Sequence, residues 1–264
     1  MIDSGAITYF STKFIFGLLI FIRVSAMIFA APVFSHAAVQ PMLKIGLAAV
    51  VAMMLTAAFA DKQPAIDTHI WSLSLLVVKE FLIGAAIGFS TAMILYAVEF
   101  AGGLLDFDIG FQTSLLFDSN SSAPTLIGQL KMMVTLMVFL GLNGHHFLLE
   151  ALAASFVAVP LDSFGVTTSA VDTLLRLVTN VTIIAIKIAS PILLSLLLVN
   201  ISLALLSRVA PQLNVFVLSF QVKVAVGLIM LFVTIPLFVM IAKTAITFFQ
   251  NETYTVIMTL NPKR

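Results

Sequence analysis

The chain has 264 residues, of which 61% are hydrophobic and 9% are charged, whereas an ordinary soluble domain is about half apolar and about a quarter charged. Its 13 basic and 12 acidic residues leave a net charge of +1, which excludes a basic surface for nucleic acid, and the lack of cysteine excludes disulfides and thiolate chemistry. With a mean hydropathy of +1.16 and four scattered histidines, the composition is that of an integral membrane protein and predicts no metal site.

Charged residues and helix breakers divide the sequence into apolar segments that we expect to be helices. They cover approximately 7–31, 42–60, 70–105, 125–159, 170–207 and 213–249. The first could be a cleaved secretory signal, but Asp3 precedes any basic residue and Pro32 would follow the cleavage point, so we expect a retained span. The sequence therefore predicts an all-α integral membrane protein of about six long apolar helices.

The last two segments are longer than a membrane span needs. At 1.5 Å per residue they would reach about 57 and 55 Å, against a hydrocarbon core about 30 Å thick. Either the helices break near Pro191 and Pro236, or they project beyond the lipid and pack against large helical partners. The loop charges show too little contrast to decide the topology.

The connection between residues 101 and 125 is apolar but interrupted by glycine and aspartate, so we expect it to be non-helical. Irregular backbone at membrane depth must be buried in protein or line a cavity. We therefore predict a re-entrant plug over residues 106–122, in which apolar side chains fill a pore and a glycine permits a tight bend. Its predicted residues are Phe107, Asp108, Gly110, Phe111, Leu115, Leu116 and Phe117. The alternative is an ordinary interfacial loop.

Several charged residues lie within or at the margins of the apolar segments. A charge at membrane depth costs about 2.5–3.5 kcal/mol, so we expect it to be paired or functional. We assign Lys79 and Lys243 to the membrane interface, where a long side chain can reach water. Lys187 shares a helix face of about 80° with three polar residues, which suits a partner helix or a wet channel. The residues predicted to form buried or inter-subunit charge seams are Arg23, Lys44, Glu99, Lys187, Arg208 and Lys223.

Two possible chemical sites are weaker. His146 and Glu150 lie four residues apart on one helix face and could relay a proton. More often, two such side chains simply interact with each other within a protein core. Ser90, with His145, has the ingredients of an intramembrane serine protease of the rhomboid type, but nothing else in the sequence builds an oxyanion hole. We expect no catalytic residues.

Short motifs occur in a fixed order along residues 20–225. They are Arg23 with Ala31-Pro32, Pro41-x-x-Lys44-x-x-Leu47-Ala48, Gly84-x-x-x-Gly88-Phe89, Asn143-Gly144-His145, Ser155-Phe156-x-x-x-Pro160 and Asn200-x-x-x-Ala204-x-x-x-Arg208-x-Ala210-Pro211-Gln212-Leu213-Asn214-x-Phe216. In these motifs the chain resembles the FliR family, a component of the flagellar type III protein-export gate with a counterpart in injectisomes. Within the plug segment only Gly110 matches the family's pattern, and Lys44 stands where the family more often has arginine.

The resemblance implies a single-copy, non-enzymatic subunit without a cofactor. Residues 1–165 would form a FliP-like part containing the plug loop, and residues 166–264 a FliQ-like helical hairpin. With FliP-like and FliQ-like subunits, and an export-switch protein of the FlhB type, the chain would form a closed helical pore for unfolded secreted proteins. It would lie in the bilayer of the bacterial inner membrane, in the flagellar basal body, and project towards the periplasm.

A proton-coupled secondary transporter is the alternative function. Lys187, Glu99 and Glu150 would then form a midplane site near helices broken at Pro191 and Pro236. Energy from ATP is not expected in either case, because the sequence lacks a GxxxxGK[ST] phosphate loop.

Overall fold

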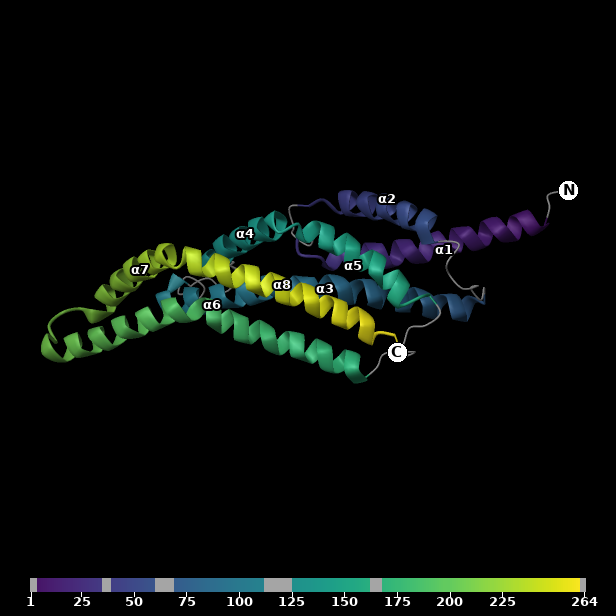
Figure 1. Cartoon of the computed structure of the whole chain (residues 1–264). Coiled ribbons are helices and arrows are strands. Elements are labelled where there is room, and N and C mark those ends of the chain that lie inside the picture. The colour runs from purple at the N-terminus through teal and green to yellow at the C-terminus, as the bar shows by residue number, and fades with distance from the viewer. Residues whose placement is uncertain (1–3, 35–38, 60–68, 112–124, 162–167, 262–264) are drawn as a thin grey trace. The chain divides into compact units, whose positions relative to one another are not determined.

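A computed structural model describes residues 4–34, 39–59, 69–111, 125–161 and 168–261, and side chains from residue 13 onward. Over these residues the regular structure is entirely helical, as Figure 1 shows. The helices are α1 (Ser4–Ala30), α2 (Pro41–Phe59), α3 (Ile70–Ile109), α4 (Leu126–Gly141), α5 (Gly144–Ala158), α6 (Thr168–Val209), α7 (Val215–Val233) and α8 (Ile235–Thr259). Five of them are long and apolar enough to cross a membrane, and α4 with α5 would make a sixth, bent span. The predicted all-α membrane fold is confirmed.

The described helices form two compact units. The first combines Met1–Met93, Asn143–Leu177 and Thr247–Arg264, and the second combines Ile94–Leu142 and Val178–Ile246. Each unit therefore takes segments from both halves of the chain. The predicted division after residue 165 concerns a likeness to two sister proteins rather than compactness, and it stays a prediction.

Pro191 does not break α6, which runs for 42 residues. A proline inside a helix has no N–H for the carbonyl four residues earlier, which here belongs to Lys187. The hydroxyl of Ser190 donates to that carbonyl oxygen at 3.2 Å, so the carbonyl keeps a donor although the regular bond is missing. Of the two alternatives for this segment, a break near Pro191 is therefore excluded.

Near Pro236 the helix does break, which was one of the two alternatives for this segment. α7 ends at Val233 and α8 begins at Ile235, so Pro236 falls in the first turn of a new helix, where its missing N–H costs nothing. Thr234 lies at the junction, and its hydroxyl donates to the Met230 carbonyl oxygen at 2.7 Å.

A second break separates α4 from α5, whose axes differ by 65°. The turn contains Asn143, whose φ of 56° is left-handed, a conformation that asparagine tolerates better than most residues. The sequence predicted one continuous segment over 125–159, because an asparagine-glycine pair indicates a helix break less strongly than a proline does.

Candidate functional site

The guanidinium of Arg23 is fully buried in the first unit, where α1, α3 and α5 meet. Its Nε donates to Glu80 Oε2 at 2.5 Å and its Nη2 donates to Oε1 at 2.9 Å, a bidentate pair. Nη1 donates to Ser155 Oγ at 3.1 Å, and Nη2 also donates to the Val159 carbonyl oxygen at 3.1 Å. The Phe156 ring centroid lies 4.1 Å from the guanidinium carbon. The charge is therefore satisfied within the chain.

Two glycines of α3 explain how this cluster forms. A Cβ at Gly84 would lie 2.1 Å from the Arg23 carbonyl oxygen, and one at Gly88 would lie 2.6 Å from the Met27 carbonyl oxygen. Their four-residue spacing therefore forms a surface against which the α1 backbone packs directly. Glu80 lies one turn before Gly84 on the same helix face, so this close crossing brings its carboxylate to Arg23.

The other predicted charge-seam residues have different surroundings. Lys44 of α2 is buried, and its Nζ lies 5.6 Å from the centroid of the Phe29 ring in α1. Glu99, Lys187 and Arg208 are exposed on their helices. Contacts of these side chains with other subunits stay predictions.

In the second unit, α3 continues to Ile109, so residues 101–109 of the expected non-helical connection are helical. The glycines here serve close packing rather than a bend: a Cβ at Gly102 would lie 2.1 Å from the Gly128 Cα in α4. Leu105 and Ile109 on the same stretch are fully buried. Tertiary packing thus outweighs the low helix propensity of glycine and aspartate, and the first part of the predicted loop, residues 106–109, is wrong.

Asp106 joins the end of α3 to the start of α4. Its side chain is 1% exposed, and both carboxylate oxygens accept from the Ile127 N–H at 3.3 Å. Thr125, at the N-cap position of α4, makes no capping hydrogen bond with its own side chain. Asp106 therefore caps α4 from another helix, and its negative charge faces the positive end of the α4 dipole.

Asp108 joins the same end of α3 to α7. Lys223 Nζ lies 4.0 Å from Asp108 Oδ1 and donates to the Asp108 carbonyl oxygen at 3.2 Å. A lysine beside the last carbonyls of a helix interacts favourably with its dipole. Gly110 then ends α3 with a φ of +98°, so its predicted role as a bend residue agrees with the backbone.

The remaining predicted plug residues divide between described and undescribed parts. Phe107 is 75% exposed and Phe111 is partly exposed. Leu115, Leu116 and Phe117 lie outside the described residues. The described residues on either side of this segment follow the α3 end that carries Asp108 and precede the α4 terminus that Asp106 caps.

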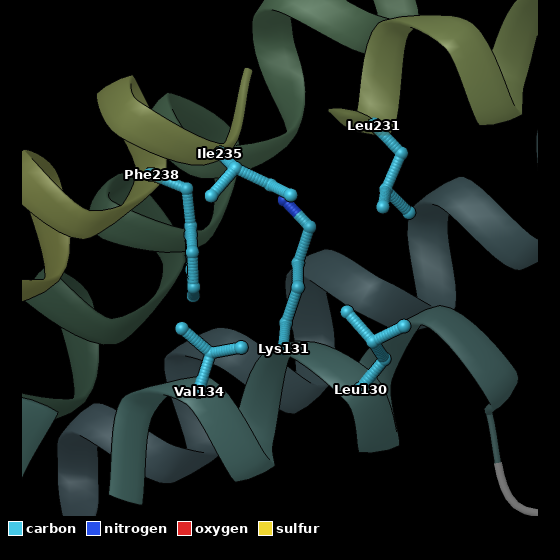
Figure 2. Close-up of a pocket in the computed structure, with 6 residues that line it drawn as sticks. All are labelled: Leu130, Lys131, Val134, Leu231, Ile235 and Phe238. Carbon is cyan, nitrogen blue, oxygen red and sulfur yellow. The ribbon is translucent and has the colours of Figure 1, made fainter. Parts of the chain in front are cut away.

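Lys131 of α4 is a buried charge that sequence reasoning missed. It is 3% exposed, and its Nζ lies 4.5 Å from the Phe238 ring centroid. Figure 2 shows its side chain rising from α4 towards Ile235, between Phe238 and Leu231. The available signal was an isolated lysine in a run without acidic residues from 119 to 149.

The chemical alternatives find no support in the described residues. The Ser90 hydroxyl donates to the Ala86 carbonyl oxygen at 2.6 Å, and the buried His145 Nδ1 has no hydrogen-bond partner, so the two do not form a nucleophile–base pair. His146 and Glu150 are both exposed. Among the described residues no group of three or more His, Cys, Asp or Glu side chains could hold a metal ion.

The sequence model of a protein family described as "Bacterial export proteins, family 1" matches residues 14–248 of this chain. The chain belongs to this family. It is 36% identical to the flagellar biosynthetic protein FliR of Bacillus subtilis over 223 residues, which cover 82% of this chain and 84% of the relative. It is 32% identical to FliR of Escherichia coli over 220 residues, 82% of each chain, and 33% identical to the Yop proteins translocation protein T of Yersinia pestis over 193 residues, 72% and 74% of the two chains.

Several residues through which the chain resembles this export family have structural roles. Arg23, Gly84 and Ser155 form the buried α1–α3–α5 contact. Asn143 adopts the left-handed turn before α5. Asn214 caps α7, because its Oδ1 accepts from the Val217 N–H at 3.4 Å. These motif residues thus lie at helix crossings and helix ends.

Proposed function

We propose that the chain is a single-copy subunit of a type III protein-export gate in the bacterial inner membrane. With FliP-like and FliQ-like subunits and an export-switch protein of the FlhB type, it forms a helical pore for unfolded flagellar substrates. Membership of the bacterial export family supports this proposal, as do the FliR relatives.

The observation that carries the proposal is the length of α6. Its 42 residues span about 63 Å at 1.5 Å per residue, roughly twice the hydrocarbon thickness. It remains apolar, yet only 28% of its apolar window is buried within the chain. Tilt absorbs only part of such a mismatch. Protein partners that cover α6 beyond the lipid account for both its length and its exposed leucines.

The plug belongs to the same proposal. Residues 112–124 connect two helix ends that Asp106 and Asp108 hold in place. A connection held at both stems can close a pore while the surrounding helices stay assembled. Its apolar residues Leu115, Leu116 and Phe117 suit a constriction that excludes ions and water.

The test is deletion of residues 112–122, which leaves both aspartate contacts and Gly110 in place. The assembled gate is purified with its sister subunits and reconstituted into vesicles, and ion flux is measured. We expect flux to rise on deletion, whereas Met53→Ala, at an exposed residue of α2 that has no part in the predicted plug, serves as the control. Unchanged flux would remove the plug role. Failure of the wild-type chain to co-purify with sister subunits would remove the gate proposal itself.

A further inference from the structure

A groove lies between α1 and α2 in the first compact unit. These two helices are antiparallel, because a Cβ at Gly17 would lie 3.7 Å from Thr56 Oγ1 whereas Phe29, later in α1, lies beside Lys44, earlier in α2. The groove has a volume of about 440 Å³, which is within the usual range for small-molecule sites. A slender molecule lying in it would contact both helices at once.

The lining of the groove is apolar except at one end. It includes the small residues Gly17, Ala49 and Ala52, whose short side chains leave the space open. The Thr56 hydroxyl donates to the Ala52 carbonyl oxygen at 2.7 Å, so it is satisfied within α2. Of the described residues that line the groove, Lys13 is the only charged one, and it is the first of them along α1. Such a lining suits a long apolar chain that carries a negative group at one end.

The apolar part of α1 begins at Lys13. The window that is apolar enough to cross a membrane covers the 18 residues Lys13–Ala30, a rise of about 27 Å, close to the hydrocarbon thickness of about 30 Å. A lysine at the end of such a span extends its ammonium to the lipid headgroups. The charged end of the groove therefore lies at the depth where phosphate groups are found.

The start of α3 marks the same depth independently. The two glycine contacts of α3, with Arg23 and then Met27, advance in the same direction along both helices, so α3 runs parallel to α1. Counted back from these contacts, Trp71 lies within about one helical turn of the level of Lys13. Trp71 is 85% exposed, and exposed tryptophan is enriched at the boundary between membrane and water.

The length of the groove distinguishes a lipid from a partner helix. Between Lys13 and Phe21, the first and last residues of α1 that line it, the helix rises about 12 Å. This is close to the thickness of one leaflet, about half of the hydrocarbon core. A spanning helix of another subunit would need a contact surface through the whole core, whereas an acyl chain occupies one leaflet.

We propose that this groove binds a phospholipid of the surrounding bilayer. Its acyl chain lies between α1 and α2, and its phosphate contacts the Lys13 ammonium. A lysine near the membrane surface attracts anionic lipids in particular, so phospholipids with a net negative charge bind best. The inference requires that α1 and α2 lie in the bilayer, and it does not depend on the gate assignment.

The first experiment tests the headgroup contact. The full-length chain is purified in detergent with the subunits that accompany it, depleted of lipid, and titrated with phosphatidylglycerol or with phosphatidylcholine of the same acyl chains. Native mass spectrometry measures the dissociation constant of the tightest lipid. We expect phosphatidylglycerol to bind more tightly, and Lys13→Gln to weaken its binding about fivefold. Lys243→Gln, at an exposed lysine of α8 outside the groove, is the matched control. Equal binding by the wild type and Lys13→Gln would overturn the inference.

The second experiment tests the acyl-chain contact. Ala49→Phe places a ring in the groove and should weaken the binding of both lipids. Val50→Phe adds the same ring at the next residue of α2, which is 57% exposed and does not line the groove, so lipid binding should not change. Unchanged lipid binding by a folded Ala49→Phe protein, or loss of a co-purifying subunit in place of lipid, would show that the groove holds no lipid. If Ala49→Phe does not fold, Lys13→Gln, at a partly exposed position, decides the question.

Discussion

The carboxylate of Asp106 near the end of α3 accepts from the backbone N–H of Ile127 in the first turn of α4. One side chain thus joins the end of α3 to the start of α4. In the sequence these two helices are connected by the 13 residues 112–124. A pore-facing role for this carboxylate is not needed to explain its position, because a buried aspartate at a helix N-terminus is satisfied there.

We expect Asp106→Ala to destabilise the protein by about 1–3 kcal/mol, because it leaves the buried Ile127 N–H without an acceptor. Asp106→Asn keeps an oxygen acceptor and loses only the charge, so it should cost less. The measurement is the melting temperature of the purified assembly in detergent. Asp172→Asn, at an exposed aspartate of α6, should leave the melting temperature unchanged. Equal effects of the alanine and asparagine variants would argue against the capping role.

The bidentate pair between Arg23 and Glu80 gives a second prediction. Arg23→Met leaves a buried carboxylate unpaired and should cost about 3–5 kcal/mol. The double variant Arg23→Met with Glu80→Met removes both charges and should be more stable than Arg23→Met alone. Chemical unfolding of the wild type, Arg23→Met, Glu80→Met and the double variant completes a double-mutant cycle. Additive losses would mean that the two side chains do not interact across α1 and α3.

Part of this architecture could be predicted from the sequence. Apolar segment lengths located the spans, and Pro236 located the α7–α8 break, because proline acts locally through its missing N–H. In the sequence Pro191 looks equivalent to Pro236, but the Ser190 hydroxyl donates to the carbonyl oxygen that the missing Pro191 N–H leaves without a donor. Asp106 was placed in a loop because its acceptor role depends on Ile127, 21 residues away. The enclosure of Lys131 could not be foreseen, since periodicity does not say which helix faces a neighbour within the chain.

Packing predicts different outcomes at two glycines, Gly102 in the α3–α4 contact and Gly46 on α2. Gly102→Ala places a methyl group 2.1 Å from the Gly128 Cα, so the backbones must separate, and we expect a loss of about 1–3 kcal/mol, as for overpacking. Gly46→Ala meets no atom within 4 Å and should stabilise α2 by up to about 1 kcal/mol through helix propensity. Thermal unfolding in detergent distinguishes the two. A neutral Gly102→Ala variant would contradict the close crossing.

The final prediction concerns the continuity of α6 at Pro191. The Ser190 hydroxyl donates to the Lys187 carbonyl oxygen, which has no regular helical donor because residue 191 is proline. Ser190→Ala should therefore cost about 0.5–1.5 kcal/mol in the wild-type background. In a Pro191→Ala background the restored N–H bonds the same carbonyl, so Ser190→Ala should cost almost nothing. The four unfolding free energies measure this coupling. An equal cost of Ser190→Ala in both backgrounds would mean that the hydroxyl does not replace the missing bond, and that α6 tolerates its proline through lateral packing alone.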